Sequence, residues 1–231
     1  MSNVDVSNGQ APLQPNLPPQ AGNDNISYTK ALLILLALLV LLGSGGYALG
    51  KYKFWKVDAA PKLDQMAAIY SSRIESDPNN PGNFIQLGYV YFQKGEYDAA
   101  ISNYKKALAL DDKNYQAHYN LALAYDITDK KDRAVQEFQK AIEIAPKAGS
   151  AHLGLGMVYK SQNACDKAIQ ELELAYKANP GDVEVLYTLG TLQEKLGNTE
   201  EALKDYQQAY DVLPSFQKAK DAIDRLKAQK K

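Results

Sequence analysis

The sequence predicts an all-α fold in which pairs of short helices repeat and stack, with one transmembrane helix near the N-terminus. The first observation behind this prediction is a fixed period of 34 residues, at which the same residue types return. The recurring residues are Ala100, Ala134, Ala168 and Ala202; Leu87, Leu121, Leu155 and Leu189; and Ala107, Ala141, Ala175 and Ala209. Such a period is typical of stacked repeats. The second observation is an uncharged, mostly apolar run over residues 31–50.

Residues 1–29 come first and are rich in Asn, Gln, Pro and Gly. They carry too little apolar surface to offset the entropy of folding, so we expect a disordered tail. A proline-rich docking motif is the alternative interpretation.

Residues 30–50 are predicted to form the transmembrane helix. An uncharged helix of twenty residues is about 30 Å long, enough to cross the hydrocarbon core. Lys30 and Lys51 flank the run, and Tyr28, Tyr52 and Trp55 suit the two interfaces. A cleaved signal peptide is the competing interpretation. We prefer an uncleaved anchor, because the Pro-rich lead holds a single Lys and no clear small-x-small cleavage site follows the run.

The side of the membrane depends on a small charge difference. Lys51, Lys53 and Lys56 follow the run, whereas only Lys30 precedes it closely. The positive-inside rule therefore favours a cytoplasmic position for everything after the span, by a margin of about two charges. An extracytoplasmic position stays open.

The remaining chain divides by the 34-residue period. Residues 51–61 are predicted to be a juxtamembrane linker, and residues 62–80 a single capping helix that ends at Asp77-Pro78. Four full repeats follow, over residues 81–114, 115–148, 149–182 and 183–216. Residues 217–231 should form a second capping helix, because Ala219, Ala222, Ile223 and Leu226 make one apolar stripe at helical spacing.

Within each repeat, large residues occupy positions 4, 7, 11 and 24, and small residues occupy positions 8, 20 and 27. The second copy shows this in His118, Leu121, Ala122, Tyr125, Ala134, Phe138, Ala141 and, at position 32, Pro146. This pattern resembles the tetratricopeptide repeat, with Gln193 and Asp112 as the clearest departures. The resemblance implies a right-handed superhelix whose first helices line a concave, peptide-binding groove.

In that family, positions 2, 5, 6, 9, 12 and 13 line the groove. The resemblance therefore implies a peptide-binding set of Ile85, Tyr89, Tyr119, Asn120, Leu123, Leu153, Met157 and Tyr187. Such a groove would hold an extended or helical peptide through hydrophobic side chains. The alternative is that some of these residues pack against the neighbouring repeat.

One specialised site of the family is not expected. Relatives that clamp a terminal carboxylate use Lys, Asn and Arg at set positions, which here correspond to Ile85, Tyr89, Asn120, Ser150 and Gly154. Only Asn120 fits, so the acidic tails of heat-shock chaperones are not the predicted partner.

No catalytic, cofactor or metal motif is present, and we predict that the protein is not an enzyme. His118 and His152 are the only histidines and both hold position 4, where packing is the expected role. We find no Cys or carboxylate partner that the repeat pattern would bring to them. Cys165 is the single cysteine and is interpreted as an incidental thiol.

The balance of charged residues limits the kinds of partner that the protein can bind. With 26 basic and 27 acidic side chains, the chain lacks the positive balance of a nucleic-acid-binding protein. We therefore expect a membrane-anchored scaffold, in a prokaryotic cell membrane by resemblance, that binds a peptide segment of a partner during assembly of a membrane or envelope complex. The alternative is a structural subunit that self-associates, as a homo-oligomer, through its repeats.

Overall fold

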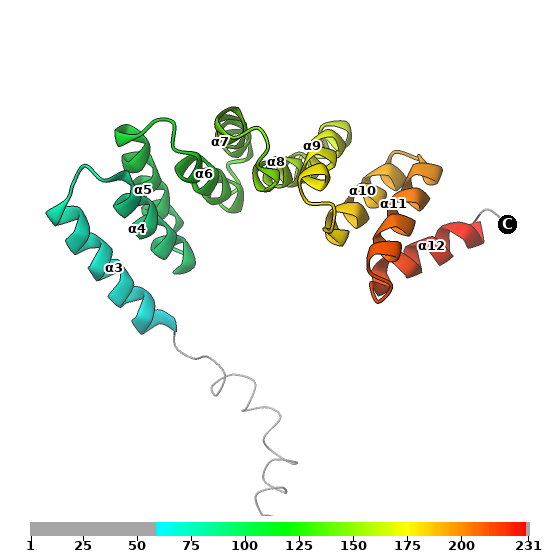
Figure 1. Cartoon of the computed structure of the whole chain (residues 1–231), viewed down its shortest axis with the longest axis horizontal. Helices are drawn as coiled ribbons and strands as arrows, with labels where there is room; N and C mark the ends of the chain where they lie inside the picture. Colours follow the sequence, from blue (N-terminus) through cyan, green and yellow to red (C-terminus); the bar gives the residue numbers. More distant parts are fainter. Residues whose placement is uncertain (1–58, 230–231) are drawn as a thin grey trace, which may run out of the picture. The chain divides into compact units, whose positions relative to one another are not determined.

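The structure is a computed structural model and describes residues 59–229. All regular structure in these residues is helical, and ten helices follow one another in chain order along a row (Figure 1). They are α3 (Ala59–Ser76), α4 (Pro81–Gln93), α5 (Tyr97–Leu110), α6 (Tyr115–Ile127), α7 (Lys131–Ile144), α8 (Gly149–Ser161), α9 (Cys165–Ala178), α10 (Val183–Lys195), α11 (Thr199–Val212) and α12 (Gln217–Gln229). The prediction of an all-α repeat fold is confirmed for this part of the chain.

The predicted tail at 1–29 and the predicted transmembrane helix at 30–50 lie outside the described residues. Among the helices of residues 59–229, none combines the length and the apolar character that crossing a membrane requires. The anchor therefore stays a prediction from the sequence.

Each 34-residue unit holds one helical pair. The first helices, α4, α6, α8 and α10, each have 13 residues, and the second helices, α5, α7, α9 and α11, each have 14. Side-chain caps start several first helices: the Asn80, Asn114 and Asp182 oxygens accept hydrogen bonds from backbone N–H groups of the first turn. An acidic residue in the first turn of every second helix complements the helix dipole.

The turn inside each pair depends on one left-handed residue. The residues with positive φ are Gly95 (78°), Asp129 (58°), Asn163 (59°) and Gly197 (83°), and they are 34 residues apart. Gly, Asn and Asp tolerate this conformation better than other residues do. The same position in each repeat therefore reverses the chain with little strain.

Close packing inside a pair depends on a small residue at position 8 facing a large one at position 24. At Gly88, an added Cβ would lie 2.6 Å from Cε1 of Tyr104, and at Gly190 it would lie 2.6 Å from Cε1 of Tyr206. Both rings are 0–1 % exposed. The glycines thus make room for the tyrosines that fill the core of their repeats.

Three of the first helices also contact one another, since α4 touches α6 and α6 touches α8. These contacts place α4, α6 and α8 on one side of the row, which we call its inner side. Helices α3 and α12 cover its two ends by packing on α4 and α11. The apolar stripe predicted for the last helix is buried as expected. Helix α3 begins at Ala59, before the predicted start at 62, because Pro61 falls in its first turn, where a missing N–H costs nothing.

Candidate functional site

The residues predicted for the groove divide into three groups by exposure. Tyr89 and Met157 are the most open, at 46 % and 42 % exposed. The partly buried members are Tyr119, Leu123, Leu153 and Tyr187. Ile85 and Asn120 are buried, at 6 % and 8 % exposed.

Ile85 and Asn120 have structural roles instead of open surface. Ile85 belongs to the same core cluster as Ala100 and Tyr104. The side-chain oxygen of Asn120 accepts a hydrogen bond of 3.1 Å from Gln116 Nε2. We therefore leave both residues out of the candidate site. They were assigned to the groove only by their positions in the repeat. Their burial depends on neighbouring side chains, which the repeat pattern does not specify.

Ile127 is an addition to the site. It is 53 % exposed and lies four residues after Leu123 on α6, so both side chains lie on the same side of the helix. Its position 13 belongs to the family's groove positions, and this was the signal that could have identified it. We use the name inner apolar face for the resulting set: Tyr89, Tyr119, Leu123, Ile127, Leu153, Met157 and Tyr187.

Two tyrosines of this face are held by other rings. Tyr119 stacks on Tyr115 at 5.9 Å between centroids and meets the edge of Phe138 at 5.8 Å. Burial raises the pKa of Tyr119, and the neighbouring Tyr115 adds to the rise. Tyr187 lies 5.3 Å from Tyr206 and 5.7 Å from Phe216. These contacts fix the rings in place, so binding a ligand on them costs little side-chain entropy.

Charged residues of the fourth repeat and α12 are paired with each other. Arg225 Nη2 donates to Glu194 Oε2 at 2.8 Å, and this contact lowers the pKa of Glu194. Lys218 lies 3.1 Å from Glu184. Because these charges have partners within the protein, the C-terminal end of the first-helix side offers little unpaired charge to a ligand.

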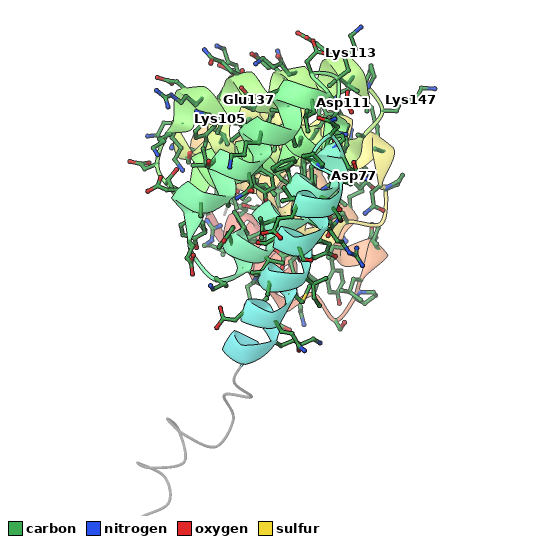
Figure 2. All side chains as sticks on the ribbon, turned by 90° about the vertical axis from the view of Figure 1, so that its left-hand side faces the viewer. Asp77, Lys105, Asp111, Lys113, Glu137 and Lys147 are labelled. Carbon is green, nitrogen blue, oxygen red and sulfur yellow. The ribbon has the colours of Figure 1, made fainter. Side chains whose placement is uncertain are left out.

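A cavity of about 770 Å³ lies between α5, α6 and α7. Its apolar lining residues include Leu108, Leu121 and Tyr125. Charges of both signs line it, and Figure 2 labels three of the charged lining residues, Lys105, Lys113 and Glu137, in the upper part of the view. The mixed charge gives this cavity no clear preference for an anion or a cation.

The two histidines correct one expectation from the sequence. His118 Nδ1 lies 2.6 Å from Glu137 Oε2, and His152 Nδ1 lies 2.6 Å from Glu171 Oε2. Carboxylate partners are therefore present, although the repeat pattern was expected to supply none. The missed signal was the 34-residue spacing of Glu137 and Glu171, which puts both at position 23. Within residues 59–229, no group of three or more metal-ligating side chains is arranged to hold an ion. Cys165 is buried in a core cluster.

Repeat 4 lacks this pairing and leaves a partly buried carboxylate without a histidine partner. Its position 4 is Leu186, which lines the same cavity as Asp205 at position 23. Desolvation raises the pKa of Asp205 from 3.8 to about 6; Lys204 opposes the shift, and Glu173 and Glu201 add to it. The folded state therefore holds a proton on Asp205 at pH values where the unfolded chain has lost it.

Asp205→Asn is expected to stabilise the protein at pH 7 by about 1–2 kcal/mol, after allowance for the partial solvation of the carboxylate. The sign follows from the raised pKa: wild-type stability falls as pH rises from 3.8 to about 6 and stays low above that. The gain should vanish near pH 4, where the native carboxyl is protonated. Urea unfolding of both proteins at pH 4 and 7 measures this. A gain that is equal at both pH values would contradict it.

The fold defines the chain as a protein of stacked helical pairs. Residues 88–126 match a family model described as TPR repeat. Residues 115–147 and 183–216 match family models described as Tetratricopeptide repeat. The chain therefore contains tetratricopeptide repeats, and the family resemblance seen in the sequence is confirmed.

Solved structures agree with this assignment. The chain is 29 % identical to the protein in the crystal structure of MamA. The matched region covers 70 % of this chain and 95 % of the MamA chain, with a TM-score of 0.63. It is 23 % identical to YrrB, described as a TPR protein with an unusual peptide-binding site (72 % and 86 % covered, TM-score 0.61). MamA 41-end from Desulfovibrio magneticus RS-1 is 17 % identical (80 % and 96 % covered, TM-score 0.63). The latter two show the fold alone. No curated protein matches the chain.

Proposed function

We propose that this protein is a membrane-anchored scaffold that binds an apolar peptide segment of a partner protein on its inner apolar face. The observation that carries the proposal is the exposure of Tyr89, Ile127 and Met157, which keep 46 %, 53 % and 42 % of their surface open to solvent. They come from three consecutive repeats and occupy equivalent or adjacent turns of the first helices. A peptide lying across the first helices could contact all three.

The chemistry of the partner follows from the charges on the same side of the protein. At the C-terminal end of this face, charges are paired within the chain, as in Glu194 with Arg225 and Glu184 with Lys218. A charged peptide that reaches this end would have to replace these contacts, whereas an apolar one gains by covering Tyr89, Ile127 and Met157. We therefore propose a segment with aliphatic or aromatic side chains and little net charge. The peptide-binding site of YrrB, a protein of the same fold, is consistent with this proposal.

The membrane anchor is the second part of the proposal and comes from the uncharged run at 31–50. It would hold the captured segment close to a bilayer, as assembly of a membrane complex requires. Protease treatment of intact cells tests the anchor and its orientation. Repeats that sediment with membranes and are cut only after lysis support a cytoplasmic scaffold. Cleavage in intact cells would reverse the orientation, and repeats free of membranes would remove the anchor.

Met157→Lys is expected to weaken peptide binding at least about tenfold, which corresponds to about 1.4 kcal/mol. The reason is that the substitution places a charge in the middle of the apolar contact. Peptides selected on the full-length protein from a random displayed library provide the ligands, and titration calorimetry measures their affinity. The selected peptides should share apolar residues and carry little net charge.

Leu174→Lys is the matched control. Leu174 is also in repeat 3 and is also 42 % exposed, but it lies on the second helix α9. Its substitution should change the affinity by less than about twofold. Equal losses in the two variants would contradict the proposed site. Binding only to further copies of this chain would replace the scaffold with the self-associating subunit.

A further inference from the structure

The two buried histidines make the same three-part arrangement in consecutive repeats. The Nδ1 atoms of His118 and His152 each lie 2.6 Å from a glutamate oxygen at position 23. Their Nε2 atoms lie 3.0 Å from Asp112 O and 3.1 Å from Pro146 O, the carbonyls at position 32 of the preceding repeats. The two rings are only 5 % and 6 % exposed. We call each set of histidine, glutamate and carbonyl a histidine link.

The number of protons in a histidine link follows from its hydrogen bonds. A backbone carbonyl can only accept, and an ionised carboxylate can only accept. Both ring nitrogens must therefore donate, or the glutamate must be protonated and donate to Nδ1. Either way the intact link contains one proton more than a neutral imidazole beside a carboxylate. When that proton leaves, one of the two hydrogen bonds is lost inside a buried site, which is costly.

Each link adds buried hydrogen bonds between segments that are otherwise joined by apolar packing and by exposed polar contacts such as that of Tyr115 with Ser150. The link of His118 connects α6 to α7 and to the connection after α5, and the link of His152 connects α8 to α9 and to the connection after α7. Together they tie repeats 1, 2 and 3 to one another. Repeat 4 has Leu186 at this position and no such link.

Other charged groups face the links and influence the loss of the proton. Lys140 Nζ lies 3.1 Å from the second oxygen of Glu137. The remaining charged groups in the cavities beside the two histidines are Lys105, Asp112, Lys113 and Glu143 for His118, and Lys147 and Lys177 for His152. The lysines favour release of the proton and the carboxylates favour its retention, so the response depends on their sum.

We infer that the two histidine links are proton-dependent locks, which hold repeats 1–3 together while protonated and loosen them when the pH rises. The sign follows from the proton count: the folded protein holds a proton that unfolded histidine and glutamate release, so stability falls as pH increases. The slope is at most one decade in the unfolding constant per pH unit for each link. This inference does not depend on the proposed peptide binding.

The test replaces both glutamates with glutamine, as E137Q/E171Q. A glutamine can donate its N–H to Nδ1 while Nε2–H donates to the carbonyl, so a neutral histidine completes the link without the extra proton. Its oxygen still accepts from Lys140 in repeat 2. The expected result is that the urea midpoint of the full-length wild type falls between pH 6.5 and 8.5. The midpoint of the variant should not fall and should rise slightly, because its folded state holds neutral histidines while the unfolded chain still loses protons near pH 6.5.

The choice of pH range and the comparison with the variant separate the effect of the histidine links from that of other titrating groups. Asp205 titrates at about 6, so its change is mostly complete at the lower end of the chosen range. Cys165 is common to both proteins, and its contribution cancels in the comparison. If the double variant does not fold, His118→Leu, which copies position 4 of repeat 4, should remove about half of the wild-type pH dependence. A wild-type midpoint that is constant between pH 6.5 and 8.5, or equal slopes in wild type and variant, would overturn the inference.

Discussion

Phe138→Ala is expected to lower the free energy of unfolding by about 3–5 kcal/mol, the usual cost of truncating a fully buried ring. Phe138 is 1 % exposed and packs between repeats 2 and 3. Its ring touches Tyr119 on α6, and it approaches Gly154 on α8 so closely that a Cβ added to this glycine would overlap the ring. Removing the ring opens a cavity at the boundary between the two repeats, where the core depends on stacking.

Urea unfolding followed by circular dichroism measures this effect. Leu110→Ala is the control, since Leu110 lies on a second helix but is 43 % exposed and should lose less than about 0.5 kcal/mol. Similar losses for the two variants would show that Phe138 is not a central element of the core. The transition of Phe138→Ala should also broaden, because weaker coupling between repeats lowers cooperativity.

Ala168→Leu is expected to destabilise the protein by about 1–3 kcal/mol through overpacking. Ala168 is 0 % exposed and lies where α9 approaches α8. An added Cβ on Gly156 would meet the Ala168 carbonyl oxygen at 3.3 Å, so the two backbones leave no room for a larger side chain. The helices must separate to accept leucine, and contacts along the pair weaken.

The comparison for this variant is Ala109→Leu. Ala109 is an exposed residue of the second helix α5, and leucine there should change the stability by no more than about 0.5 kcal/mol. Thermal unfolding of both variants gives the difference. If Ala168→Leu were as stable as Ala109→Leu, the tight pairing of α8 and α9 would be refuted.

The period of 34 residues was enough to predict the helical pairs and their cores, because packing positions repeat with the backbone. Position 24 shows this: Tyr104, Phe138 and Tyr206 are all 0–1 % exposed. The apolar stripe from Ala219 to Leu226 could also be predicted from the sequence, since helical periodicity alone defines the buried side of a terminal helix.

The candidate site was less predictable, because the exposure of a residue depends on side chains that neighbouring helices bring against it. Ile85 and Met157 hold groove positions 5 and 9, yet one is 6 % and the other 42 % exposed. Ile127 was missed although it is the most exposed of the set. The histidine links escaped notice because a histidine and its glutamate are 19 residues apart, a spacing that belongs to no familiar motif. Only the comparison of repeats reveals it.

Photo-crosslinking of a selected peptide tests the central claim, that the inner apolar face is the binding surface. A photo-reactive residue replaces either Tyr89 on the first helix α4 or Val212 at the end of the second helix α11, two positions that are both 46 % exposed. We predict that the peptide is trapped at position 89 and is not trapped at position 212. Crosslinking at 212 without crosslinking at 89 would contradict the account and move the binding site to the second helices.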